Sequence, residues 1–86
     1  MDNNLLGELN KVNTKGDLSK FIMSLVHDLK KNKAQWENDD LSSFLEAMSA
    51  WVDDMDGLYG ERKNLTVDGE YWKLFAEMLF AAKYYE

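Results

Sequence analysis

Acidic side chains are the residues of this 86-residue chain whose spacing comes closest to a known chemistry. Residues 53–57 place three aspartates before a glycine, as calcium loops do. An EF-hand also needs an oxygen donor at position one and glutamate at position twelve. With the glycine of residues 53–57 at position six, Val52 and Lys63 occupy those two positions. With Gly69 at position six, Phe75 occupies position twelve. We therefore expect no metal site.

Catalytic templates are also missing from the sequence. His27 is the single histidine, and its neighbour Asp28 points about 100° away around a helix, so the two cannot form a catalytic dyad by adjacency. No serine lies in a G-x-S-x-G turn, and the five glycines form no phosphate-binding loop. We predict a protein that is not an enzyme and that uses no cofactor.

Three amphipathic helices are predicted from the apolar spacing, which follows i, i+3, i+4, i+7 and is uninterrupted by proline. Their expected ranges are about 17–32, about 39–56 and about 69–85. Their apolar faces are Leu18, Phe21, Ile22, Leu25, Val26 and Leu29; Leu41, Phe44, Leu45, Met48, Trp51, Val52 and Met55; and Tyr71, Trp72, Leu74, Phe75, Met78, Leu79, Ala81, Ala82 and Tyr85. The third arc is the widest, which predicts the most buried helix.

The first dozen residues carry Leu5, Leu6, Leu9 and Val12, which is compatible with a short helix or an ordered arm. A chain of 86 residues with 45% hydrophobic residues can bury one core. The sequence therefore predicts an all-α fold: a single domain over residues 1–86, built as a small bundle of three main helices with a possible short N-terminal helix.

Charge is distributed unevenly along the chain, whose net charge is −6. Residues 1–35 carry six lysines against four acids, residues 36–57 carry seven acids and no base, and residues 58–86 carry four bases against five acids. An acidic excess argues against nucleic-acid binding through a basic face. The polar, acidic start predicts no signal peptide, no apolar run is long enough for a membrane helix, and the absence of cysteine suits the cytoplasm.

Four acidic residues of the second predicted helix define what we call the acidic strip: Asp39, Glu46, Asp53 and Asp56. Together with Ser42 and Ser49 they step by three and four along one side of the helix, next to its apolar face. Such a strip either keeps the protein soluble or binds a basic partner that relieves the repulsion between its carboxylates.

Aromatic residues divide into two groups. Trp36, Trp51 and Trp72 fall on or beside apolar faces, where core packing is expected. Phe80 and Tyr84 instead form an i, i+4 pair on the polar side of the third helix. They are either covered by the N-terminal arm or form an exposed anchor for a partner.

Two blocks of the sequence resemble a family of small acidic bacterial proteins of unknown function. The first block reads FLEAxxAW, then DG, and contains Phe44, Leu45, Glu46, Ala47, Ala50, Trp51, Asp54, Asp56, Gly57 and Tyr59. The second reads WxxFAxxLxAAKxYE and contains Trp72, Phe75, Ala76, Leu79, Ala81, Ala82, Lys83, Tyr85 and Glu86. The resemblance spans about residues 17–86 and leaves Phe80 and Tyr84 at open positions. It implies no activity, and by analogy such proteins are similar to immunity proteins that accompany bacterial toxins.

The sequence therefore predicts a non-enzymatic, cytoplasmic protein-binding domain of the immunity-protein type. Its partner would be a basic protein, such as a toxin domain, captured by the acidic strip and by Phe80 and Tyr84. The alternative is a structural or regulatory homo-oligomer, a homodimer in its simplest form, assembled through the third helix.

Overall fold

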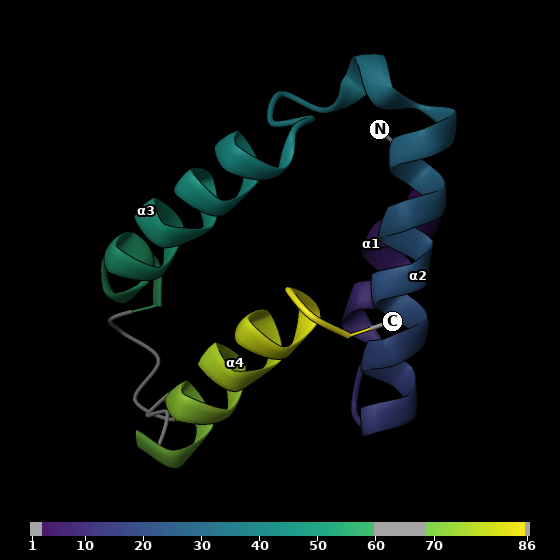
Figure 1. Ribbon diagram of the computed structural model, residues 1–86. Coiled ribbons are helices and arrows are strands. Elements are labelled where there is room, and N and C mark those ends of the chain that lie inside the picture. The colour runs from purple at the N-terminus through teal and green to yellow at the C-terminus, as the bar shows by residue number, and fades with distance from the viewer. Residues whose placement is uncertain (1–2, 60–68, 86) are drawn as a thin grey trace. The chain divides into compact units, whose positions relative to one another are not determined.

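The computed structural model describes residues 3–59 and 69–85 of the chain (Figure 1). Within these residues the regular structure is helical and contains no strand. The elements are α1 (Asn3–Asn10), α2 (Lys15–Lys31), the short 3-10 helix η1 (Lys33–Gln35), α3 (Leu41–Tyr59) and α4 (Gly69–Ala82). This confirms the predicted all-α class, with three main helices and a short N-terminal one. The chain forms two compact units, Met1–Ala50 and Trp51–Glu86, and the predicted single domain stays a prediction.

Capping side chains set where α2 and α3 begin. The side chain of Thr14 accepts a hydrogen bond from the backbone N–H of Asp17 at 3.0 Å, so α2 begins two residues before the predicted position. Asp40 has the same role at α3, where its Oδ1 accepts from the backbone N–H of Ser43 at 2.8 Å. Because Asp40 is the cap, α3 begins at Leu41, two residues after the predicted position.

The end of α4 differs from the prediction by three residues. The backbone N–H groups of Lys83 and Tyr84 donate to the carbonyls of Phe80 and Ala81, three residues earlier, at 3.2 and 3.0 Å. The Ala81 carbonyl also accepts from the backbone N–H of Tyr85 at 2.9 Å, so this mixture of i→i−3 and i→i−4 bonds closes the helix in a turn after Ala82.

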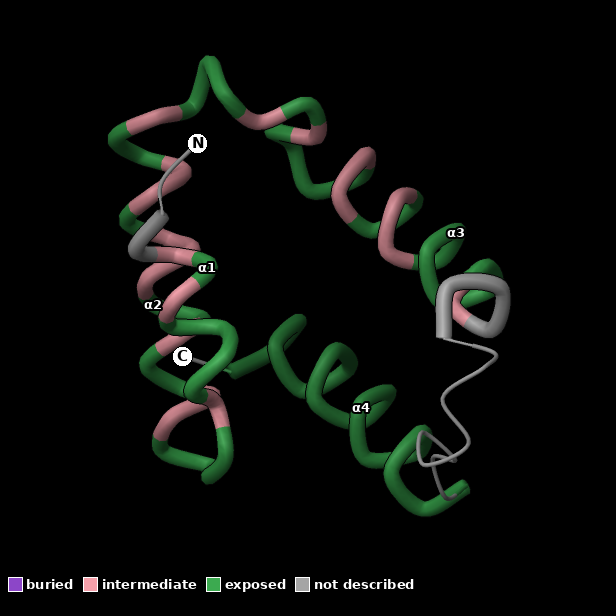
Figure 2. The backbone as a smooth tube through the Cα atoms, turned by 180° about the vertical axis from the view of Figure 1, so that it is seen from behind, coloured by how far each residue is buried: buried purple, intermediate pink, exposed green. Residues whose placement is uncertain are grey.

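In the Met1–Ala50 unit, α1 lies alongside α2 (Figures 1 and 2). A side-chain hydrogen bond joins the two helices, from the Ser24 hydroxyl to Oε1 of Glu8 at 2.6 Å. Leu5 of α1 and Phe21 of α2 are half-buried. The first dozen residues therefore include an ordered helix that packs on its neighbour.

Burial differs along the chain. Half-buried residues occur in α1, in α2 and in α3 as far as Met55, whereas every described residue of α4 is exposed (Figure 2). The prediction that this helix would be the most buried is therefore wrong. Within the Trp51–Glu86 unit, α4 packs against no other described helix, so its wide apolar arc has no covering element there. None of the helices described is both long enough and apolar enough to cross a membrane.

Candidate functional site

The acidic strip is partly ordered by α3. Glu46 and Asp53 lie seven residues apart in this helix, which places them two turns apart on one side, and both side chains are exposed. Asp56 follows within α3, but its side chain lies outside the described residues. Asp39 is exposed and precedes Asp40, the residue that caps the helix, so the helical period does not set its direction.

Carboxylates on and beside the acidic strip lack a basic partner in the described part of the chain. Glu37 and Asp54 are exposed, as are Asp39, Glu46 and Asp53. None of the five forms a salt bridge with a described lysine. Among the described residues, no group of three or more carboxylate or imidazole side chains is placed to hold a metal ion. What the strip offers is therefore negative charge open to solvent.

Asp40 is separate from this group because its carboxylate is used within the protein. The hydrogen bond from the backbone N–H of Ser43 is the largest cause that lowers the pKa of Asp40, and the hydroxyl of the same serine, as a donor, is the second. The acid stabilises the start of α3 and is not a candidate partner-binding residue.

Phe80 and Tyr84 form the exposed pair that the sequence predicts as one of two possibilities. Their ring centroids lie 5.5 Å apart with the planes at 65°, an edge-to-face contact. Phe80 is 66% exposed and Tyr84 is 64% exposed. The Nζ atom of Lys83 lies 5.2 Å from the centroid of the Tyr84 ring, within the range of a cation–π contact. No described hydrogen bond, salt bridge or ring contact links this pair to Asp53.

A second cluster, in the Met1–Ala50 unit, was not predicted as a site. The indole N–H of Trp36 donates to Oδ2 of Asp28 at 2.7 Å, and Nδ2 of Asn32 donates to Oδ1 of the same carboxylate at 2.9 Å. The Trp36 ring also stacks on Phe44, with centroids 6.1 Å apart and the planes at 25°. All four side chains are half-buried.

Asp28 is anionic in this arrangement. The hydrogen bond from Trp36 is the largest cause that lowers its pKa, and the bond from Asn32 is the second. Sequence reasoning considered Asp28 only as a neighbour of His27, which is exposed. The signal that could have found the cluster is the i, i+4 spacing of Asp28 and Asn32 on one helical face, with a tryptophan just beyond the helix end.

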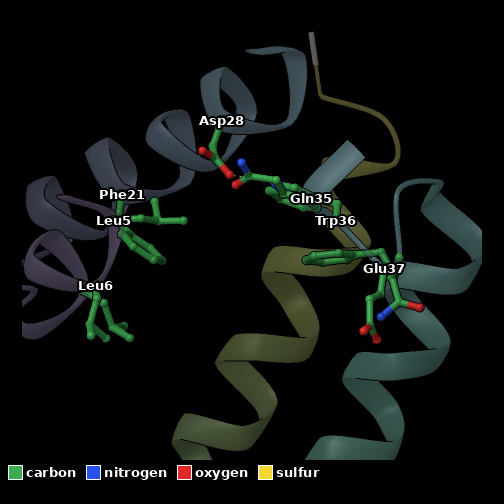
Figure 3. Close-up of a pocket in the computed structure, with 10 residues that line it drawn as sticks. Leu5, Leu6, Phe21, Asp28, Gln35, Trp36 and Glu37 are labelled. Atoms are coloured by element: carbon green, nitrogen blue, oxygen red, sulfur yellow. Dashed lines mark hydrogen bonds between the residues drawn. The ribbon is translucent and has the colours of Figure 1, made fainter. Parts of the chain in front are cut away.

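Beside this cluster lies a cavity of about 610 Å³, which we call the Trp36 groove (Figure 3). Figure 3 shows Leu5, Leu6 and Phe21 on one side and Trp36 on the other, with Asp28 bonded to the tryptophan. The lining consists of Leu5, Leu6, Leu9, Phe21, Asp28, Gln35, Trp36, Glu37, Asn38 and Phe44. All of them belong to the Met1–Ala50 unit.

Comparison with known proteins identifies a family. No curated protein matches the chain, and no solved structure does. A family model described as a family of unknown function, DUF7660, matches residues 14–86, which confirms the resemblance seen in the sequence. Helix α1 precedes the matched residues. Because the match covers most of the chain, the protein belongs to this family of unknown function, DUF7660.

Proposed function

We propose that the protein is a non-enzymatic binding domain of the cytoplasm that captures a basic protein partner, in the manner of an immunity protein that neutralises a toxin domain. The observation that carries this proposal is the acidic stretch 36–57, in which seven acids occur without a base. Its described carboxylates are exposed, and those other than Asp40 have no structural role that a hydrogen bond or salt bridge reveals. A chain without cysteine suits a reducing compartment.

The acidic strip would act first on the rate of association. A surface with one sign of charge attracts an oppositely charged partner and raises the association rate, most strongly at low salt. The negative charge that attracts the partner includes Glu46 and Asp53, which α3 holds on one side of the helix. In the complex, cations of the partner would offset the repulsion among the carboxylates, a relief that the free protein lacks.

Phe80 and Tyr84 would act after encounter. Two aromatic rings that are about two-thirds exposed lose their contact with water when a partner covers them, which slows dissociation. Their edge-to-face contact restricts both rings before binding, so less conformational entropy is lost on association. The strip and the aromatic pair would thus control different steps of one binding event.

The test begins with the immobilised full-length protein in native lysate, washed at low and then at high salt. We expect a basic protein to elute with salt, and its association rate is then measured against variants. Asp53→Lys with Asp56→Lys should slow association about tenfold and flatten its salt dependence while helical content stays the same. The matched control compares single substitutions: Asp53→Lys should slow association severalfold, whereas Glu70→Lys, the same change of charge in the first turn of α4, should leave the rate within about twofold. Equal effects of these two single substitutions would contradict a specific role for the strip.

A structural or regulatory homo-oligomer is the second candidate, and the exposure of α4 favours it. Tyr71, Leu74 and Leu79 are 57%, 49% and 49% exposed on this helix, and Phe80 is 66% exposed on its polar side. A two-fold contact between two copies of α4 would cover these side chains, and the acids would then serve solubility. A stable dimer in sedimentation that Phe80→Ala dissociates would favour this candidate over partner capture.

A further inference from the structure

We propose that the Trp36 groove is the docking site for an amphipathic, basic helix of the partner protein. This inference rests on the proposed function, because it gives the secondary structure and the entry point of the basic partner. The groove differs from the acidic strip and from the aromatic pair, since its lining shares no residue with either.

The lining of the groove fits the apolar face of a helix. Six of the ten lining residues are leucine, phenylalanine or tryptophan, contributed by α1, α2, α3 and the segment that precedes α3. A volume of about 610 Å³ is within the range of about 300–1,000 Å³ found for ligand sites, and it exceeds what one side chain fills. Apolar anchors spaced i, i+3, i+4 and i+7 on a helix enter grooves of this kind together.

The charge of the lining selects a basic occupant. Asp28 and Glu37 are the charged residues among the ten, and no lysine, arginine or histidine is present. Asp28 accepts hydrogen bonds from Trp36 and Asn32, yet neither of these donors carries a charge, so the carboxylate keeps its full negative charge. A lysine or arginine next to the apolar anchors of a helix would offset this charge from the solvent side.

The open form of the groove favours a helix over a small ligand. Leu6 and Leu9 line one wall and are 54% and 50% exposed. Small-molecule sites cover about 70–90% of a drug-sized ligand, which needs more enclosure than these half-exposed leucines give. A helix lying along the groove would cover the two leucines and bring its own apolar face out of water at the same time.

Trp36 is already held in the position that docking needs. Its indole N–H is fixed by Asp28, and its ring is stacked on Phe44 at 6.1 Å. A side chain that is ordered before binding loses little conformational entropy on binding. Because α1 supplies Leu5, Leu6 and Leu9 but precedes the residues that match the family, this wall would give the present chain its own partner preference.

The test is an NMR titration of the full-length, isotope-labelled protein with a synthetic helical peptide. The peptide carries leucines at i, i+3, i+4 and i+7 and lysines on the flanking positions. One control peptide has the same residues in scrambled order, and another has glutamate in place of every lysine. We expect shifts of the Trp36 indole N–H and of the Leu6 and Leu9 amides with the basic amphipathic peptide, and much weaker binding of both controls.

Two sets of protein variants separate the groove from other surfaces. Leu6→Gln with Leu9→Gln should weaken binding of the basic peptide about tenfold, because two leucines lose their apolar contact with the anchors. The matched control is Leu41→Gln with Leu45→Gln, exposed leucines of α3 that do not line the groove, and it should leave the affinity unchanged. Glu37→Gln and Asp28→Asn should each lower affinity and reduce its dependence on salt.

Several results would overturn the groove proposal. These are no binding of the basic peptide, equal binding of the scrambled or acidic peptide, equal effects of the two leucine pairs, and shifts that report only self-association of the protein. Binding that is lost in the variant Asp53→Lys, Asp56→Lys but kept in Leu6→Gln, Leu9→Gln would overturn the groove and support the acidic strip. If the protein binds the basic peptide but captures no basic protein in the lysate test, the proposed function is contradicted and the groove proposal is not.

Discussion

The two compact units each contain a pair of aromatic rings, and the pairs have opposite surroundings. Trp36 and Phe44 in the first unit are half-buried, and the tryptophan is hydrogen-bonded to Asp28. Phe80 and Tyr84 in the second unit touch edge to face and are about two-thirds exposed. Aromatic rings therefore give internal order in the first unit, where Trp36 and Phe44 also line the proposed groove, and form a freely exposed pair in the second.

The difference follows from what lies next to each pair. Asp28 and Asn32 are on α2 and Trp36 follows η1, so the hydrogen bonds join the end of α2 to the segment that leads into α3. Phe80 is in the last turn of α4 and Tyr84 is in the turn that follows, where the Lys83 Nζ atom lies over the Tyr84 ring. Removing a ring from the first pair should lower stability as well as binding in the Trp36 groove, whereas removing one from the second should affect association with little loss of stability.

Trp36→Ala should have the largest effect on stability. Truncation of a fully buried tryptophan costs about 3–5 kcal/mol, and for a half-buried one we expect a loss of about 2 kcal/mol in the free energy of unfolding. The loss of a bonded partner for Asp28 adds to the effect. Urea denaturation followed by circular dichroism measures it.

Trp36→Phe is the control that separates the ring from its hydrogen bond. Phenylalanine keeps the stacking on Phe44 but removes the indole donor, so we expect a loss of about 1 kcal/mol. A loss as large as that of Trp36→Ala would show that the hydrogen bond, and not the ring packing, stabilises this region. No loss in either variant would contradict the internal role of Trp36.

Asp28→Asn should have a smaller effect at neutral pH and a distinct dependence on pH. The pKa of Asp28 in the folded protein lies below its ordinary value of 3.8 because of the bonds from Trp36 and Asn32. Its contribution to stability is thus present above the ordinary pKa and is lost as pH falls through the lowered value. The stability difference between the wild type and Asp28→Asn should shrink as pH falls below about 4.

Asp40 does not affect the stability difference between the wild type and Asp28→Asn. Its pKa is also lowered, by the hydrogen bond from the Ser43 backbone, so it adds an acid-sensitive contribution of the same sign. Both proteins retain Asp40, and the difference between them therefore reports Asp28. A difference that stays constant across the acid range would argue against a hydrogen-bonded, anionic Asp28.

The sequence predicted the helices better than it predicted their surroundings. The apolar stripe that starts at Leu18 gave α2 within two residues at each end, since a single helix encodes its own period. The sequence also placed Phe80 on the polar side of this helix but left open whether the N-terminal arm covers it, and the ring is exposed. The spacing of apolar residues shows that a helix has an apolar face but not which element covers that face. For that reason α4 was expected to be buried, and it is exposed.

The Trp36 cluster could not be found by the same reasoning. Trp36 lies between helices, where no helical period applies, and its hydrogen bond to Asp28 joins residues eight positions apart, across the end of α2 and the short helix η1. For the acidic strip, sequence spacing placed Glu46 and Asp53 on one side of a helix, but the position of the cap excluded Asp39 from that helix. The hydrogen bond by which Asp40 caps α3 sets the first residue of this helix, and the apolar spacing does not reveal that bond.

Phe80→Ala should have the smallest effect on stability and a large effect on association. A ring that is 66% exposed contributes little by burial, and its edge contact with Tyr84 is worth about 1 kcal/mol at most. The matched control is Tyr85→Ala, whose ring is 86% exposed and is not part of the pair. A loss of about 2 kcal/mol or more for Phe80→Ala would show that the ring is covered and would remove the contrast between the two units.

If Phe80→Ala keeps the stability of the wild type, sedimentation and the affinity for a basic partner distinguish the two proposed functions. Dissociation of a dimer by Phe80→Ala but not by Tyr85→Ala supports the homo-oligomer, whereas a monomer that loses affinity for a basic partner supports capture.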